Sequence, residues 1–103
     1  MIICEEMNKL RTALDKMGVE WVNASEEWGI GERDTFIRDF YICRTHFDYN
    51  NKHYSVINGY GSFGGYDMFS YDNKGFLEIR FPNGEVEGYL TAADIIKIIK
   101  EYE

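Results

Sequence analysis

The sequence predicts a single α+β domain over residues 1–103, in which two helices cover an antiparallel sheet of about four to five strands. Apolar residues recur at helical spacing near the two ends of the chain. Between these ends, segments rich in β-branched and aromatic residues flank Asn50-Asn51 and Asn83-Gly84, which predict two hairpins. A chain of 103 residues is long enough for one core and too short for two.

The first helix is predicted over residues 3–17. Its apolar stripe is formed by Ile3, Met7, Leu10, Ala13, Leu14 and Met17. Gly18 follows, where helices often end in the left-handed conformation that glycine tolerates. Residues 19–22 favour a short strand. Residues 23–34 are acidic and contain glycine, so we expect an exposed loop anchored by Trp28.

The first hairpin begins with a strand predicted within residues 35–49 and turns at Asn50-Asn51, because asparagine tolerates positive φ. Pairing outward from this turn places Asp48 opposite His53 and Arg44 opposite Ile57. Because side chains alternate along a strand, one face joins the core and the other is polar. The core face carries Cys43, Thr45, Phe47, Tyr54 and Val56. The polar face carries Arg44, His46, Asp48, His53 and Ser55.

The second hairpin is predicted from residues 76–81 and 85–90 around a two-residue turn, Asn83-Gly84. This register pairs Phe81 with Val86, Leu77 with Leu90, and Arg80 with Glu87. The last helix follows, with Thr91 as its N-cap and Asp94 completing a capping box. Its apolar stripe is Ile95, Ile98, Ile99 and Tyr102.

Composition excludes several classes of function. The formal net charge of −7 argues against direct nucleic-acid binding, which needs clustered cations to displace counterions. No segment approaches the length of about 20 apolar residues that spans a membrane. The first ten residues, MIICEEMNKL, lack the pattern of a secretion signal, so we expect a cytoplasmic protein without a membrane partner. Cys4 and Cys43 have neither metal-ligand spacing nor a disulfide-rich context, which favours reduced thiols.

The motif GYGSFGGY at residues 59–66 has the G-x-G-x-x-G spacing of phosphate-binding loops. A kinase would also need a lysine strand and a catalytic loop, and a dinucleotide fold would need a helix directly after the glycines. The sequence has no such lysine strand or catalytic loop, and no helical pattern follows the glycines directly. We therefore reject catalytic phosphate binding. The rings of Tyr60, Phe63 and Tyr66 could instead stack on a base or grip a partner protein. The alternative is a surface loop whose rings fold back on the sheet.

The polar face of the first hairpin offers a second group of candidate residues. His46, Asp48 and His53 could ligate a divalent metal, and a solvated sheet face is the plainer alternative. Arg44 could bind an anionic group or pair with one of the many acids. Neither cysteine has an identified base, and Ser55 and Ser62 lack a convincing triad, so we predict a protein that is not an enzyme and uses no cofactor.

Four segments together resemble short uncharacterised proteins encoded by phages and prophages of gut Firmicutes. They are GVEW at 18–21, RTHF at 44–47, YSVINGYGSFGG at 54–65 and EGYLTAAD at 87–94. The resemblance spans most of the chain and departs at residues 23–40 and 66–75. Because no activity is assigned to this group, the resemblance implies a genomic setting and no catalytic residues.

In that setting we expect a non-catalytic accessory protein that antagonises bacterial immunity by binding and sequestering a small signalling nucleotide. Such proteins typically form their pockets between subunits, so a homo-oligomer is expected. The predicted ligand-binding residues are Arg44, His46, Tyr60, Ser62, Phe63 and Tyr66. The glycines would let the backbone approach the ligand, the rings would stack on a base, and the cationic groups would meet phosphate.

Two alternatives stay open at this point. An acidic inhibitor could bind a host defence protein that itself binds nucleic acid, as anti-CRISPR proteins do. Trp21 or Trp28 would be its buried anchor. Its acidic surface would comprise Glu20, Glu26, Glu27, Glu32 and Asp34. A metal-binding or structural phage protein is the other alternative.

Overall fold

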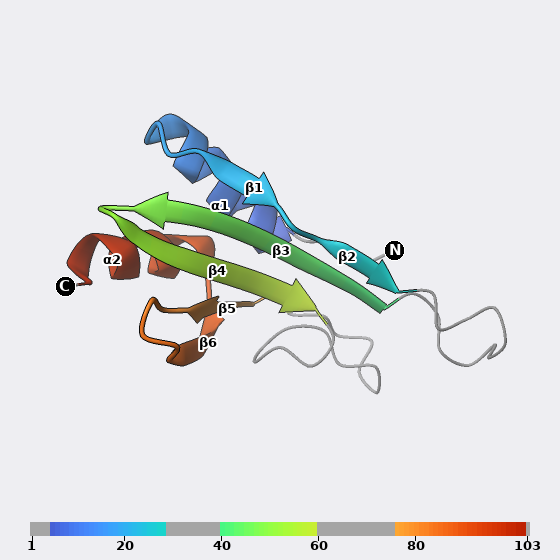
Figure 1. Cartoon of the computed structure of the whole chain (residues 1–103). Helices are drawn as coiled ribbons and strands as arrows, with labels where there is room; N and C mark the ends of the chain where they lie inside the picture. Colours follow the sequence, from blue (N-terminus) through green and yellow to red (C-terminus); the bar gives the residue numbers. More distant parts are fainter. Residues whose placement is uncertain (1–4, 29–39, 60–75, 103) are drawn as a thin grey trace, which may run out of the picture.

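The computed structural model describes residues 5–28, 40–59 and 76–102. Within these ranges the chain forms, in order, α1 (Glu5–Lys16), β1 (Trp21–Asn23), β2 (Glu26–Trp28), β3 (Phe40–Tyr49), β4 (Lys52–Gly59), β5 (Leu77–Arg80), β6 (Val86–Leu90) and α2 (Ala92–Glu101) (Figure 1). The predicted α+β class is confirmed: an antiparallel sheet is combined with an N-terminal and a C-terminal helix that pack together.

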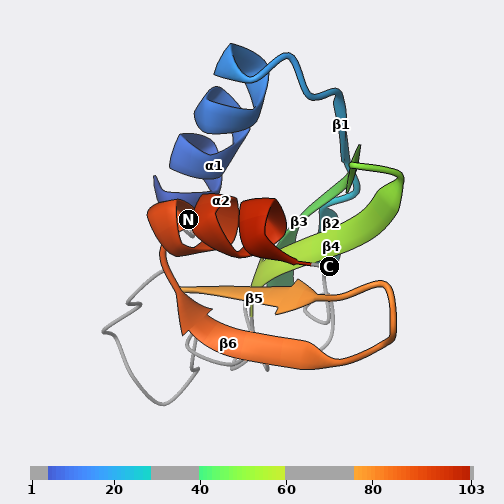
Figure 2. The same ribbon diagram turned by 90° about the vertical axis from the view of Figure 1, so that its left-hand side faces the viewer.

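The strands lie in the order β1-β3-β4-β5-β6, and all pairs are antiparallel. β1 pairs with residues 45–47 of β3, whereas β2 pairs with residues 40–42, so these two short strands share one edge of β3. Figure 2 shows both helices on one side of the sheet, which curves so that β5 and β6 lie beneath α2. The opposite face of β1, β3 and β4 is turned toward the viewer in Figure 1.

α1 packs on the sheet through Met7, Leu10 and Leu14, which are fully buried. The helix ends at Lys16, and Gly18 follows with the left-handed conformation that was predicted for it, at a φ of 73°. The backbone N–H of Val19 donates to the carbonyl of Leu14 at 2.9 Å, closing the last turn. The part of the predicted helix before residue 5 lies outside the described residues.

The register predicted for the first hairpin is confirmed. Asp48 lies opposite His53, and the ladder continues in that register to the pairing of Ile42 with Gly59. Asn50 and Asn51 have φ values of 52° and 62°, as a two-residue turn of this kind requires. The five predicted core residues are each at most 3% exposed: Cys43, Thr45, Phe47, Tyr54 and Val56.

The prediction of an exposed loop over residues 23–34 is wrong for residues 26–28, which form β2. Two adjacent glutamates have low strand propensity. The antiparallel pairing of the β2 backbone with β3 nevertheless outweighs this propensity. Ser25 helps to place β2, because its hydroxyl accepts a hydrogen bond from the Arg44 N–H at 3.1 Å. Residues 29–34, and the expected start of the next strand at 35–39, lie outside the described residues.

The second hairpin has a three-residue loop and not the predicted two-residue turn. The Phe81 N–H donates to the Glu85 carbonyl at 2.8 Å, and Gly84, with φ 90°, ends the loop. In a two-residue loop at Asn83-Gly84, residue 82 would have to donate this closing hydrogen bond. Pro82 has no N–H, so Phe81, the residue before it, donates the closing hydrogen bond.

This change shifts the register of the second hairpin. Arg80 pairs with Val86 and Ile79 with Glu87, so the predicted pairs of Arg80 with Glu87 and of Phe81 with Val86 are wrong. A bulge follows, and it contains a left-handed residue, Tyr89, with φ 59°. The bulge restores the predicted pairing of Leu77 with Leu90.

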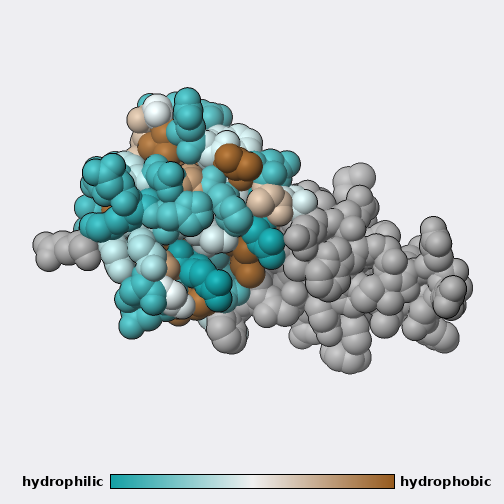
Figure 3. Space-filling view, in the orientation of Figure 1, coloured by the Kyte–Doolittle hydropathy of each residue, from teal (hydrophilic) through white to brown (hydrophobic). Residues whose placement is uncertain are grey.

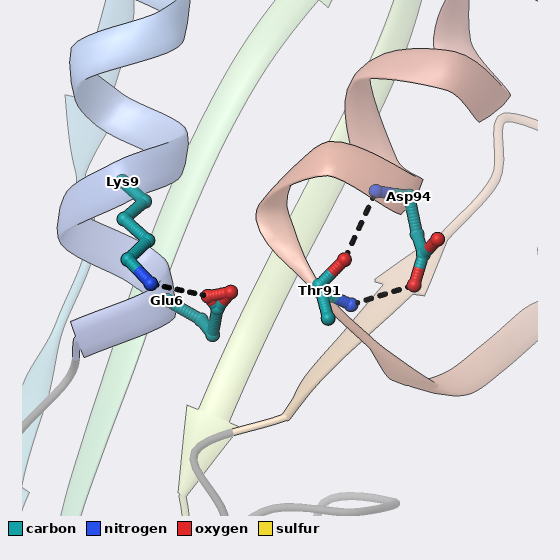
Figure 4. A network of polar contacts seen from close by, with 4 residues as sticks. All are labelled: Glu6, Lys9, Thr91 and Asp94. Carbon is teal, nitrogen blue, oxygen red and sulfur yellow. Dashed lines mark hydrogen bonds and ion pairs between the residues drawn. The ribbon is translucent and has the colours of Figure 1, made fainter.

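α2 begins with the predicted capping box, drawn in Figure 4. The Thr91 hydroxyl accepts from the Asp94 N–H at 3.2 Å, and the Thr91 N–H donates to the Asp94 carboxylate at 3.0 Å. Figure 4 also shows Glu6 reaching from α1 toward this helix start, with Lys9 paired to it at 3.7 Å. A negative charge there complements the helix dipole.

The stripe predicted for α2 packs inward. Ile95 and Ile99 are buried, and Ile98 and Tyr102 are partly buried against the core. Tyr102 stacks on Phe81 with ring centroids 5.1 Å apart, which joins the end of α2 to the second hairpin. In the part of the chain that the structure describes, neither helix is long and apolar enough to cross a membrane.

Arg11 ties α1 to the edge of the sheet. Its Nε donates to the hydroxyl of Thr45 at 2.8 Å, and its Nη2 donates to Asn23 at 3.1 Å and to the Arg44 carbonyl at 3.2 Å. The guanidinium also lies 4.7 Å from the centre of the Trp21 ring, a cation–π contact. One side chain therefore links the helix to both β1 and β3.

The substitution Arg11→Met is expected to reduce the free energy of unfolding by about 1–3 kcal/mol, because it removes the charged donor from the fully buried Thr45 hydroxyl. Urea denaturation followed by circular dichroism measures this. The control is Lys16→Met on the exposed side of the same helix, expected to change stability by at most about 0.5 kcal/mol. Equal losses in the two variants would contradict the role given to Arg11.

Thr91→Ala is expected to cost about 1 kcal/mol, because it leaves the Asp94 N–H without its cap. Thr12→Ala is the matched control: Thr12 lies exposed within α1, and its hydroxyl donates to the carbonyl of Asn8 one turn earlier. Alanine favours a helix interior, so this control is expected to be neutral or slightly stabilising. If thermal unfolding gave Thr91→Ala no lower a midpoint than Thr12→Ala, the capping contribution would be refuted.

Candidate functional site

The face of β3, β4 and β5 away from the helices gathers the polar side chains predicted for the first hairpin; we call it the open face. Ser55 on β4 lies opposite His46 on β3 and opposite Arg80 on β5. Cross-strand partners share a face, so these three residues form one row across the sheet. Figure 3, in the orientation of Figure 1, shows mainly hydrophilic residues with isolated hydrophobic ones on the coloured part of this side.

The open face is hollowed into a concavity of about 510 Å³, exposed to solvent on one side and called here the first concavity. Its lining comprises Arg44, His46, His53, Ser55, Ile57, Glu78, Arg80 and Val86. The volume is in the range of small-molecule sites, about 300–1,000 Å³. Two guanidinium groups and two imidazoles oppose one carboxylate, so this part of an acidic chain is suited to an anion.

His46 and His53 lie side by side on this face, with ring centroids 5.5 Å apart and the rings edge to face. His53 Nδ1 lies 2.8 Å from the Asp48 carboxylate, so its ring orientation is held by a hydrogen bond. Burial, and then repulsion from His53 and Arg44, lower the pKa of His46 from its ordinary value. A bound anion would oppose that repulsion and favour the protonated imidazole.

The three residues considered as metal ligands are adjacent, as the register predicted. No group of three or more His, Cys, Asp or Glu side chains among the described residues could hold a metal ion. Asp48 is bonded to His53, and His46 meets His53 ring to ring. The described face therefore gives no support to the metal-binding alternative.

The open face also shows no activated nucleophile in its described part. Ser55 faces His46 across the ladder, but no hydrogen bond joins its hydroxyl to either imidazole of the described face. Nucleophilic catalysis normally requires such a contact between nucleophile and base. That the protein is not an enzyme stays a prediction.

The structure brings together only some of the predicted ligand-binding residues. Arg44 and His46 both line the first concavity. Four others, and the motif GYGSFGGY beyond Gly59, lie outside the described residues: Tyr60, Ser62, Phe63 and Tyr66. Sequence reasoning missed Arg80, because the incorrect register of the second hairpin paired it with Glu87. Sequence reasoning also considered Ser55 only for a catalytic triad and His53 only as a metal ligand.

Trp21, one proposed anchor for a partner protein, has partners within this chain. Its indole N–H donates to the Asp15 carboxylate at 2.8 Å, and Arg11 lies over its ring. The side chain of Trp28 is outside what the structure describes.

No protein-family model, no curated protein and no solved structure matches this chain.

Replacing His46 with glutamine should change how stability depends on pH. The folded state holds the His46 pKa below the unfolded value of about 6.5, so it binds this proton more weakly than the unfolded chain does. Neutral His46 contributes fully to the free energy of unfolding above pH 6.5, the unfolded pKa. This contribution falls as the pH decreases from about 6.5 through the lowered pKa of the folded state.

Relative to the parent, His46→Gln should therefore become more stable as pH falls from about 7.5 to about 5. Urea denaturation at each pH measures the difference, and the values at about pH 8, where the histidine is neutral in both states, give the baseline. If the free energies of unfolding of the parent and of His46→Gln changed in parallel over this pH range, the environment described for His46 would be ruled out.

Proposed function

We propose that the protein is a non-catalytic binding protein that captures a small signalling nucleotide on the open face, holding its phosphate in the first concavity. The observation that carries this proposal is the gathering of Arg44, Arg80 and the two imidazoles around one hollow in a chain of net charge −7. Guanidinium groups match the geometry of phosphate oxygens and remain charged at all relevant pH values.

Arg80 is the strongest candidate for the phosphate contact. It is exposed on the open face, and no ion pair or hydrogen bond with another described residue engages its side chain. Ser55 lies beside it on β4 and carries a hydroxyl that can donate to the same oxygens. His46, on the far side of Ser55, can donate an N–H while neutral and can take up a proton as the anion binds.

The backbone under this site is held from the core side. The Arg44 carbonyl accepts from Arg11 and its N–H donates to Ser25, so the β3 residue that carries this guanidinium is anchored on both sides. A binding group on an ordered strand loses little backbone entropy when a ligand arrives. This placement supports capture by a largely preformed face.

In the setting implied by the resemblance to phage and prophage proteins, such capture would remove an immune signal from the host bacterial cytoplasm. The first concavity is open on one side, so a second copy placed over it would enclose the ligand more completely. We therefore keep the homo-oligomer as part of the proposal. Light scattering with and without ligand tests it.

The test is a panel of cyclic mononucleotides, cyclic dinucleotides and ADP-ribose compounds, screened by thermal shift and followed by calorimetry. At least one nucleotide should stabilise the protein. Arg80→Gln should weaken its binding by about tenfold or more, since a charge-assisted hydrogen bond contributes about 1.5–3 kcal/mol. Lys97→Gln, the same charge change on an exposed residue of α2, should leave affinity within about twofold.

A panel in which no nucleotide stabilises the protein would overturn the proposal. Tight binding to a nucleic-acid-binding defence protein in its place would favour the acidic inhibitor. Equal losses in Arg80→Gln and Lys97→Gln would show that only the overall charge matters and that the first concavity is not the site.

A further inference from the structure

A second concavity, of about 500 Å³, adjoins the first on the open face. His46 and His53 line both, so the imidazole pair forms the boundary between them. On the far side of this boundary the described lining includes Glu20, Val22 and Asp48. A molecule whose phosphate occupies the first concavity can therefore extend over the imidazoles into the second.

The two concavities differ in chemistry. The first contains both arginines, whereas the second contains two carboxylates and no arginine or lysine among its described lining residues. Val22 is 63% exposed and lies directly opposite His46, so an apolar group and a flat ring stand next to each other. Such surfaces pack against planar rings, and carboxylates accept hydrogen bonds from N–H donors.

We infer that the second concavity binds the base of the captured nucleotide and selects bases that carry an exocyclic amino group, through Glu20 and Asp48. This inference rests on the proposed function, because it takes the phosphate to lie in the first concavity. The carboxylates repel a phosphate, which fixes the direction in which the nucleotide lies. They also disfavour a carbonyl oxygen at the position where an amino group would donate.

Glu20 is the better residue to test. Asp48 already holds His53 through a hydrogen bond at 2.8 Å, so its replacement would also disturb the imidazole pair. Glu20 is exposed and lies just before β1, and no hydrogen bond or ion pair with another described residue engages its carboxylate. Glu20→Gln should therefore fold normally, which circular dichroism checks.

The experiment measures dissociation constants by calorimetry for adenosine and inosine 5′-monophosphates and for the 3′,5′-cyclic forms of both nucleosides. Each pair has the same phosphate. The inosine member replaces the amino group with a carbonyl oxygen and has a proton on N1, where adenosine has an acceptor. The parent protein should bind the adenosine member about tenfold more tightly, as loss of a hydrogen bond to a charged group would give. Glu20→Gln should reduce this preference to about threefold or less, while Glu101→Gln, an exposed acid on α2, should preserve it.

Equal affinity for adenosine and inosine members in the parent protein would overturn this inference and leave the proposed function standing. A preference that survives in Glu20→Gln would also overturn it, because the selection would then not come from Glu20. Failure of all four nucleotides to bind would overturn it too. The wider nucleotide panel then decides separately whether the proposed function falls.

Discussion

The hydrogen bonds of Arg11 set the position of the sheet edge on which the candidate site depends. This side chain reaches from α1 to Thr45, to the carbonyl of Arg44 and to Asn23, so it fixes β1 and β3 against each other from the core side. Strand pairing has a period of two, and a slip of one residue would exchange the buried and exposed faces. The Asn50-Asn51 turn and the alternating buried residues of β3 place Arg44 and His46 on the open face. Arg11 then holds β1 against this strand through its hydrogen bonds to Asn23 and Thr45.

Core and site are therefore made by the same strands. Cys43, Thr45 and Phe47 point toward the helices, whereas Arg44 and His46 between them line the first concavity. Packing on one side makes the backbone rigid, and the other side can carry polar and charged groups that stay partly exposed to solvent. This division explains how two arginines and two histidines can gather on so small a domain.

The sequence predicted the register of the described part of the first hairpin, and it predicted the second hairpin only in part. Asn50-Asn51 joins two strands with clear alternation, so turn and pattern specify one register. In the second hairpin Pro82 removed the N–H needed by the expected turn, and the bulge at Tyr89 shifted the register back. The pairing of β4 with β5 has no local signal, because residues 60–76 separate them. Arg80 could not be assigned to the site without it.

The acidity of the chain is compatible with the proposed phosphate binding, because it would select a small anion over a nucleic acid. Fields from separated surface charges fall off within about 8–10 Å at physiological salt. A small anion in the first concavity would therefore interact mainly with its lining, where Arg44, Arg80 and the imidazoles oppose one carboxylate. A nucleic acid extends much further and would meet the surrounding acids, including Glu20 and Asp48 on the same face. Under the proposed function, net negative charge would disfavour a nucleic acid and leave the local attraction for a single nucleotide intact.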